Sequence, residues 1–403
     1  MTRRVVVTGA GAVTALGVGV DATLEAMREG RSAIGPLRIR DVERLSIRVG
    51  AVVPGWDEAA RFTRAERSLL DCYAQFAVVA AAEAVAASGI RFEGEAAERA
   101  GVVLGTSGGG LQTQDDNYRL VYAEGRDRVH PFTVPRLMNS AAAAHLSLRH
   151  GLLGPAFTVS SACASSNHAI AQAAGLIRAG LADAMLSGGA EAMLCFGGVK
   201  AWEGLRVMAP DTCRPFCRTR TGMVQGEGAA VFVLEARDRA VARGAPILAE
   251  IAGAAMTADA ADIVLPSEDG AVRAIRGAMR DAGFGPDDVA YVNAHGTGTA
   301  ANDRIECAAL RRVFGPAADR LMVSSTKAMH GHCIGAAGAV ELLACIMALR
   351  DGVVAPTANH RERDPDCALD VVPNVAREVR VGACLSNAFA FGGMNAVLAL
   401  RAA

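Results

Sequence analysis

The sequence predicts an α/β protein made of two similar halves, and three observations support this class. Short valine-rich runs ending in Gly, Ser or Thr alternate with alanine-rich segments of helical pattern. The chain has 403 residues, 51% of them hydrophobic, which is more than one hydrophobic core usually holds. A strand-and-turn segment starting at Gly101 is echoed by one starting at Tyr291, and a helix led by Cys163 or Gly335 follows later in each half.

The expected strands are buried, because their apolar residues are continuous and do not alternate with polar ones. In chain order they cover residues 4–8, 101–104, 184–186, 229–234, 290–293 and 396–400. No low-complexity linker interrupts the chain, so we expect two closely packed halves. We place the boundary between an N-terminal half, residues 1–240, and a C-terminal half, residues 241–403.

Composition and charge exclude several functional classes. Lys and Arg number 41 against 42 Asp and Glu, so no excess of positive charge favours nucleic acid. The most apolar stretch, residues 74–87, is interrupted by Gln75 and Glu83 and is too short for a transmembrane helix. The N-terminus lacks the apolar region of a secretory signal. We therefore expect a cytoplasmic protein.

The ten cysteines are scattered, which is typical of reduced thiols in an intracellular protein. Two clusters suggest a metal site, Cys213 with Cys217, and His330 and His332 with Cys333. Neither supplies the paired spacing of a zinc site, so we expect no metal.

The opening run, residues 5–17, places glycines after a strand, as a dinucleotide-binding fold does. Gly9, Gly11 and Gly17 do not keep the GxGxxG spacing, and no acidic ribose-binding residue follows. We favour glycines of tight turns over a nucleotide site.

The segment VSSACASSNHAI, residues 159–170, carries the strongest chemical signal. A β-type run gives way there to a helical pattern that continues through Gly180, which puts Cys163 at a helix N-terminus. Free backbone N–H groups and the positive end of the helix dipole stabilise a thiolate at such a position. Small neighbours leave the sulfur accessible. We interpret Cys163 as a nucleophile, the alternative being an inert buried cysteine.

Two further segments add candidate catalytic residues at strand ends. NAHGTGTAAND, residues 293–303, places His295 after an apolar strand, and SSTKAMHGHCIGAAGAVELL, residues 324–343, places Lys327 and His332 before a helix. A single histidine is more often structural, but this shared placement favours a site. The run SNAFAFGGMNA, residues 386–396, is expected to be a flexible loop whose backbone approaches a substrate.

With these motifs in this order, the chain resembles the β-ketoacyl-[acyl carrier protein] synthases, condensing enzymes of the thiolase fold. The likeness covers nearly the whole length and includes GMVQGEGA, residues 222–229. It is greatest to the elongating group, and more narrowly to nodulation protein E-like synthases, through residues 205–216, 261–267 and 367–378. The resemblance implies two α/β halves packed as a five-layer αβαβα sandwich.

The resemblance also implies a reaction. Cys163 accepts an acyl chain from acyl carrier protein, malonyl carrier protein loses carbon dioxide, and the resulting carbanion attacks the acyl-Cys163 carbonyl to give a β-ketoacyl product. His295 and His332 donate hydrogen bonds through Nε2 to the malonyl thioester oxygen. The N–H groups of Cys163 and Phe391 form a second oxyanion hole.

Other positions receive supporting roles from the same resemblance. Lys327 pairs with Glu341 and sets the field around His332. Thr297 and Thr299 bind the phosphopantetheine arm, which arrives on the carrier protein, so no resident cofactor is implied. Phe391 gates the acyl pocket. The implied assembly is a homodimer, or a heterodimer with a subunit resembling a chain-length factor.

The chain departs from many elongating synthases at several positions. Cys217 and Thr221 replace aspartates, Ala390 replaces a glycine beside the gate, and Val264 replaces a threonine. We infer an altered acyl preference. Two alternatives stay open: a non-catalytic chain-length factor, which Cys163 argues against, and a thiolase or initiating synthase, which His332 argues against.

Overall fold

The computed structural model describes residues 3–403 and contains one continuous eleven-stranded sheet that is folded into two halves. The strands of the first half occur in the order β6-β5-β7-β8-β1, and those of the second half in the order β11-β10-β14-β15-β9. The first set comprises β1 (Val5–Thr14), β5 (Ala100–Gly105), β6 (Ala156–Val159), β7 (Ala184–Glu191) and β8 (Gly228–Ala236). The second comprises β9 (Ala249–Ala258), β10 (Tyr291–Asn293), β11 (Met322–Ser324), β14 (Ala383–Ala390) and β15 (Met394–Arg401).

The two halves share one topology. In the first, β5 pairs in parallel with β6 and β7, whereas β8 is antiparallel to β7 and β1. In the second, β10 pairs in parallel with β11 and β14, whereas β15 is antiparallel to β14 and β9. The halves join where β1 pairs with β9 over Val5–Val7. The predicted similarity of the halves is therefore confirmed, and each of the six expected strands is present.

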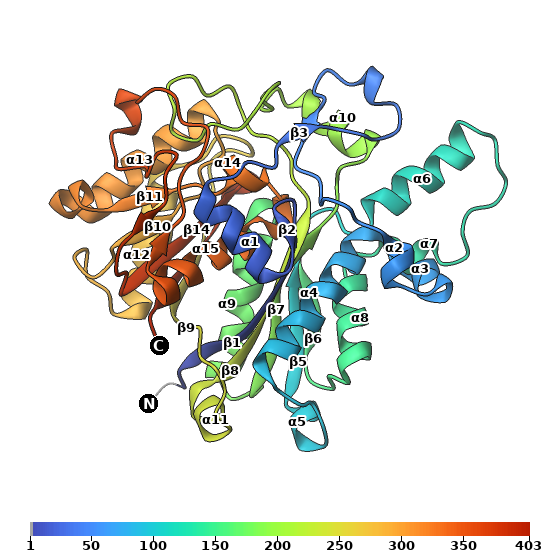
Figure 1. Ribbon diagram of the computed structural model, residues 1–403, viewed down its shortest axis with the longest axis horizontal. Coiled ribbons are helices and arrows are strands. Elements are labelled where there is room, and N and C mark those ends of the chain that lie inside the picture. The colour runs from blue at the N-terminus through green and yellow to red at the C-terminus, as the bar shows by residue number, and fades with distance from the viewer. Residues whose placement is uncertain (1–2) are drawn as a thin grey trace.

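Helices complete five layers. Helices α9 (Ser165–Arg178) and α15 (Ala337–Asp351) contact strands of both halves and form the central layer (Figure 1). The outer layer of the first half contains α4 (Cys72–Ser88) and α8 (Ala141–His150), and that of the second contains α12 (Glu268–Ala282) and α13 (Ala300–Phe314). Nearly every residue of α15 is buried, as a helix between two sheets requires. The predicted αβαβα sandwich is confirmed.

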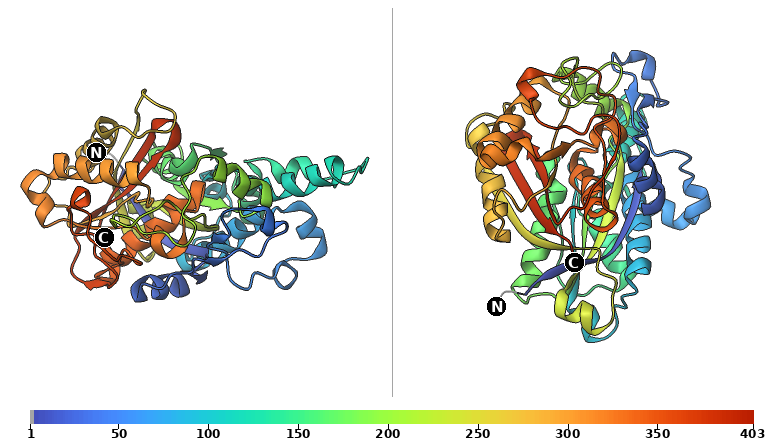
Figure 2. Two further views of the ribbon diagram at one scale, coloured as in Figure 1. Left: turned by 90° about the horizontal axis from the view of Figure 1, so that it is seen from above. Right: turned by 60° about the vertical axis from the view of Figure 1, so that its left-hand side comes forward.

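The remaining elements lie around these layers. Helix α6 and the loop after it project from the body of the molecule (Figure 2). Within residues 3–403, no helix combines the length and apolar character that crossing a bilayer needs. The other helices are α1 (Val20–Glu29), α2 (Glu58–Arg61), α3 (Arg64–Leu69), α5 (Glu95–Glu98), α6 (Leu111–Tyr122), α7 (Thr133–Leu137), α10 (Phe196–Gly204), α11 (Arg237–Ala242) and α14 (Lys327–His330). The short strands are β2 (Gly17–Val18), β3 (Gly35–Pro36), β4 (Val49–Gly50), β12 (Val353–Val354) and β13 (Arg377–Glu378).

Gly9 and Gly11 do not form tight turns, contrary to expectation. Both lie inside β1, where α4 crosses so closely that a Cβ atom at Gly9 would be 2.1 Å from the carbonyl oxygen of Ala84. At Gly11 it would be 1.9 Å from the carbonyl oxygen of Ala80. These glycines let the helix α4 approach the strand closely.

The division of the chain at 240/241 stays a proposal. The last strand of the first half ends at Ala236 and the first strand of the second half begins at Ala249. The short helix α11 lies between them.

Candidate active site

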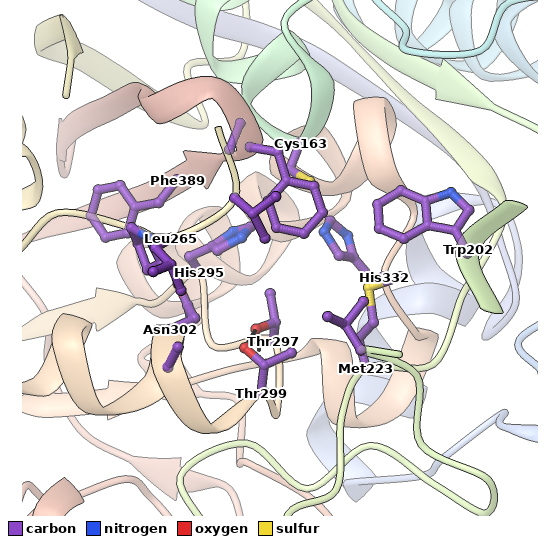
Figure 3. Close-up of a pocket in the computed structure, with 16 residues that line it drawn as sticks. Cys163, Trp202, Met223, Leu265, His295, Thr297, Thr299, Asn302, His332 and Phe389 are labelled. Carbon is purple, nitrogen blue, oxygen red and sulfur yellow. Dashed lines mark hydrogen bonds between the residues drawn. The ribbon is translucent and has the colours of Figure 1, made fainter. Parts of the chain in front are cut away.

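A narrow cavity of about 150 Å³ leads from an exposed loop to Cys163. Val264, Leu265 and Pro266 line its outer part, and His295 and His332 line it beside the sulfur (Figure 3). Its other lining residues are Trp202, Val207, Met223, Thr297, Thr299, Ala301, Asn302, Phe389, Ala390 and Phe391. Most of these side chains are apolar, so the cavity excludes water from the groups at its end.

Cys163 occupies the predicted turn between β6 and α9. It lies in a short 3₁₀ turn, Ala162–Ala164, directly before the first residue of α9. Ala162 has φ of +48°, a left-handed conformation that non-glycine residues rarely adopt. Such strain is characteristic of a sharp strand-to-helix turn that presents a nucleophile.

The prediction that the helix N-terminus stabilises a thiolate at Cys163 is wrong for the protein without substrate. Cys163 is only 5% exposed, and burial raises the pKa of its thiol to about 12. The nearby Lys327 charge acts in the opposite direction but does not outweigh the loss of water. The sulfur is accessible through the cavity alone, as a protonated thiol.

The two histidines converge on this sulfur from the second half. His295 follows β10 by two residues, and His332 lies between α14 and the turn that leads into α15. The sulfur of Cys163 and one ring nitrogen from each histidine lie within 4.8 Å of one another. The two rings meet edge to face, with centroids 5.5 Å apart. The structure thus brings together the three residues that the sequence predicted as catalytic.

Hydrogen bonds fix the tautomer of both rings. The backbone N–H of Ile334 donates to Nδ1 of His332 over 3.2 Å, and Nζ of Lys327 lies 3.4 Å from Nδ1 of His295. Because Nδ1 accepts in each ring, the proton of each neutral imidazole is on Nε2. Burial, followed by the Lys327 charge, lowers the pKa of both histidines well below its ordinary value. Both rings are therefore neutral hydrogen-bond donors at Nε2.

Lys327 and Glu341 form the predicted pair, and both side chains are fully buried. Lys327 also contacts His295, which was not predicted. Nζ of Lys327 donates to the carbonyl oxygen of His295 over 2.6 Å and faces the ring of His295, whereas its influence on His332 is through charge. Burial raises the pKa of Glu341 to about 7 even though Lys327 opposes the shift.

Thr297, Thr299 and Phe391 all line the cavity, and their roles in binding the pantetheine arm and gating the acyl pocket stay predictions. The hydroxyl groups of the two threonines lie 2.8 Å apart and below the imidazoles in Figure 3. The Phe391 ring stacks on Trp202, with centroids 5.9 Å apart and planes 25° apart. The glycine loop is shorter than predicted. Residues 386–390 belong to β14, and only Phe391–Gly393 form the turn.

Two residues that shape this site were not predicted from the sequence. Trp202, on α10, packs against the predicted gate from the other half of the molecule. Glu306, on α13, accepts the backbone N–H groups of His295 over 2.9 Å and Gly296 over 2.8 Å. The only sequence signal for Glu306 is an acidic residue in the helix that follows the His295 loop. This pattern is too common to indicate a functional role by itself.

The cysteine clusters considered for metal have other contacts. The sulfur of Cys217 accepts backbone N–H groups from Arg361 and Glu362. Burial acts to raise the pKa of the Cys217 thiol, but these bonds and the Thr219 hydroxyl outweigh it and leave the pKa lowered. His330 contacts Thr326 over 3.0 Å and Cys333 over 3.8 Å, whereas His332 faces the cavity.

Two family models together cover most of the chain. The N-terminal domain of β-ketoacyl synthases matches residues 2–240, and the C-terminal domain matches residues 248–361. Nodulation protein E of Rhizobium leguminosarum bv. trifolii is 50% identical over 401 residues, with all of both chains covered. The 3-oxoacyl-[acyl-carrier-protein] synthase 2 of Staphylococcus aureus (strain N315) is 37% identical over 406 residues, covering 99% of this chain and 98% of that protein.

Solved structures agree with these matches. The ishigamide ketosynthase/chain length factor superposes with a TM-score of 0.95 and 36% identity, covering all of both chains. A type II polyketide synthase acyl-carrier protein in complex with its ketosynthase, bound to the hexaketide, also matches. That match has a TM-score of 0.90 and 30% identity, again over the full length of both chains.

Proposed function

Because the chain belongs to the β-ketoacyl synthase family, we propose that Cys163, His295 and His332 carry out its condensation reaction. Family membership makes the chain an acyltransferase of the elongating type, which condenses an acyl chain with a malonyl unit held on acyl carrier protein. The proposal assigns each step of that reaction to atoms of this site.

In the first step, the Cys163 sulfur attacks the thioester carbonyl of the acyl carrier protein. The sulfur–carbonyl bond forms, the bond to the pantetheine sulfur breaks, and the thiol proton ends on the departing pantetheine thiol. The backbone N–H groups of Cys163 and Phe391 stabilise the oxyanion. Since the thiol has a pKa of about 12, this step needs the sulfur to lose its proton as the bond forms.

In the second step, malonyl carrier protein occupies the same cavity with its pantetheine arm beside Thr297 and Thr299. Loss of carbon dioxide leaves an electron pair that becomes an enolate, whose oxygen faces Nε2–H of His295 and His332. The carbanion then attacks the acyl carbonyl, and the Cys163 thiolate leaves and regains a proton from solvent.

One observation carries the assignment. Both imidazoles accept a hydrogen bond at Nδ1, so both carry their proton at Nε2, and one nitrogen of each ring lies within 4.8 Å of the Cys163 sulfur. Two preorganised neutral donors in a dry site stabilise developing negative charge better than water does, because they need no reorientation. The same protons occupy the nitrogen lone pairs that a metal ion would need, which favours an oxyanion over a metal.

The test separates the two steps. We expect His332→Ala to lower decarboxylation of malonyl carrier protein about 100-fold or more, since one oxyanion donor is lost. The rate of Cys163 acylation, measured by intact-protein mass spectrometry, should fall far less. Unchanged decarboxylation would remove His332 from the mechanism.

For the assembly, we propose a homodimer formed at the free edge of β6. This strand ends the sheet, and the nearby apolar side chains Leu148, Leu153 and Phe157 are exposed. A heterodimer with a chain-length-factor-like subunit is the alternative, as in the ishigamide ketosynthase. Light scattering of the purified chain distinguishes a dimer from a monomer that awaits another subunit.

Three finer statements complete the proposal. The substrates are unsaturated acyl or polyketide chains of a specialised pathway, supported by the similarity to nodulation protein E. A panel of saturated and unsaturated acyl carrier proteins tests this by competition. We propose that phosphopantetheine on the carrier protein is the only prosthetic group used, which full activity after dialysis against a chelator would support. A cytoplasmic location, expected from the unpaired cysteines, is testable by cell fractionation.

A further inference from the structure

The carboxylate of Glu191 joins segments from both halves of the molecule. This residue ends β7 and is fully buried. One carboxylate oxygen accepts the Thr106 hydroxyl over 3.1 Å and the Gly108 N–H over 3.0 Å. The other oxygen accepts the Ser107 N–H over 2.7 Å and the Gly335 N–H over 2.9 Å. Four donors therefore satisfy this buried carboxylate, three from the segment after β5 and one from the second half.

Gly335 is held from its other side as well. Its carbonyl oxygen accepts a short hydrogen bond from the hydroxyl of Ser166. Ser166 lies in the first turn of α9, three residues after Cys163. A Cβ atom at Gly335 would be 2.4 Å from the Ser107 nitrogen and 2.6 Å from a Glu191 oxygen, so only glycine fits. Two side chains of the first half therefore fix the N–H and the C=O of one residue of the second half.

This fixed residue lies three positions after His332. Between them, the N–H of Ile334 holds Nδ1 of His332, and Ile334 itself has a left-handed φ of +43°. A strained residue persists only where its surroundings hold it. Neither Glu191 nor Ser166 lines the cavity at Cys163, so neither touches a substrate there.

We propose that Glu191, together with Ser166, is a positioning pair that sets His332 relative to the Cys163 sulfur. The pair holds Gly335, Gly335 holds the strained Ile334, and Ile334 fixes the ring whose Nε2–H faces the enolate. The inference rests on the proposed function, since it assigns a geometric requirement to the decarboxylation step. A displacement of the donor by about 1 Å is enough to cost a large part of its effect.

The substitution Glu191→Gln tests the proposal with little change of volume. An amide has one oxygen, and its NH₂ group would face N–H donors that now point at a carboxylate. We expect malonyl carrier protein decarboxylation to fall at least 10-fold, while the rate of Cys163 acylation stays within 3-fold of the wild type. Ser166→Ala should shift the same ratio in the same direction, by a smaller factor.

Glu235→Gln is the matched control. Glu235 is also a buried glutamate of this sheet, paired with Arg243 at the opposite end of β7 and β8 from Glu191. It should lower thermal stability without changing the ratio of the two half-reactions. A merely structural role for Glu191 would give the same pattern as this control.

The outcomes divide clearly. A selective loss of decarboxylation in Glu191→Gln or Ser166→Ala supports the positioning role. An equal loss of both half-reactions, or no loss, overturns it while leaving the proposed function intact. If Glu191→Gln does not fold, Ser166→Ala decides by the same ratio. Failure of the wild-type protein to perform either half-reaction overturns the proposed function and this inference with it.

Discussion

The turn at Cys163 and the turn at Gly335 have the same design but opposite uses. Each is a three-residue 3₁₀ turn leading directly into a helix of the central layer. Each starts with a non-glycine residue of positive φ, Ala162 at +48° and Ile334 at +43°. The next residue is Cys163 in the first half and Gly335 in the second, where the echo in the sequence places them.

The difference lies in what each turn faces. At Cys163 the side chain points into the cavity, where a thioester can reach it. At Gly335 the equivalent space holds Glu191 and the Ser107 backbone, so no side chain is possible. A strained turn of this kind can therefore present a nucleophilic side chain, or its backbone can be held by side chains from another part of the molecule. In the proposed mechanism, the turn at Cys163 serves the chemistry and the turn at Gly335 fixes the histidine that the chemistry needs.

The largest effect should come from filling the second turn. Gly335→Ala places a methyl group against backbone and a buried carboxylate, so we expect a loss of about 1–3 kcal/mol in the free energy of unfolding. Urea denaturation measures it. Gly175→Ala, in open space on α9, is the control and should stabilise by about 0.5–1 kcal/mol. A Gly335→Ala protein as stable as the wild type would contradict the comparison.

The pH dependence of the thiol tests how strongly the first turn activates the sulfur. Because the pKa of Cys163 is about 12, the thiolate fraction rises with pH throughout the accessible range. Alkylation of Cys163 by iodoacetamide should therefore accelerate about tenfold per pH unit between pH 7 and 9. Peptide mass spectrometry at each pH measures this rate. A plateau below pH 9 would mean that the turn lowers the pKa more than burial raises it.

The smallest effect concerns the contact between Trp202 in the first half and Phe391, the predicted gate, in the second half. Aromatic pairs contribute about 0.5–1.5 kcal/mol, so Trp202→Leu should make displacement of Phe391 easier. We expect the rate of Cys163 acylation to rise about threefold. Rapid-quench experiments with mass spectrometry of the acyl-enzyme measure this rate. Trp56→Leu, at a tryptophan that meets Phe76 edge to face away from the cavity, should leave this rate unchanged. A slower acylation rate in Trp202→Leu would contradict this prediction. It would indicate that the Trp202 ring shapes the acyl pocket and does not restrain Phe391.

Local patterns predicted much of this molecule. Continuous apolar runs located six strands, and a strand followed by small residues and a helix located Cys163. His295 was predicted for a similar reason, because strand ends of an α/β sheet converge on one edge. His332 lies farther from its strand, after β11 and α14. The predicted thiolate was wrong because a helix N-terminus is visible in the sequence, whereas the burial that dominates the pKa depends on the whole fold.

Most contacts that the sequence did not reveal join residues far apart in the chain. Glu191 and Gly335 are 144 positions apart, and their contact forms where β7 packs against the turn Ile334–Ala336. Trp202, on α10, likewise meets Phe391 only when the two halves pack together. Glu306 is only eleven residues from His295, but its contact depends on how the loop between β10 and α13 folds back. An isolated acidic or aromatic residue has no local pattern that distinguishes these contacts from an ordinary surface or core position.

The central claim is that Cys163 alone carries the acyl chain. Intact-protein mass spectrometry after incubation with an acyl carrier protein substrate tests it most directly, with Cys163→Ala alongside. The account predicts one acyl adduct on the wild-type protein, mapped to the peptide of Cys163, and no adduct on a folded Cys163→Ala protein. A wild type without an adduct, or an adduct that persists in Cys163→Ala, would contradict it.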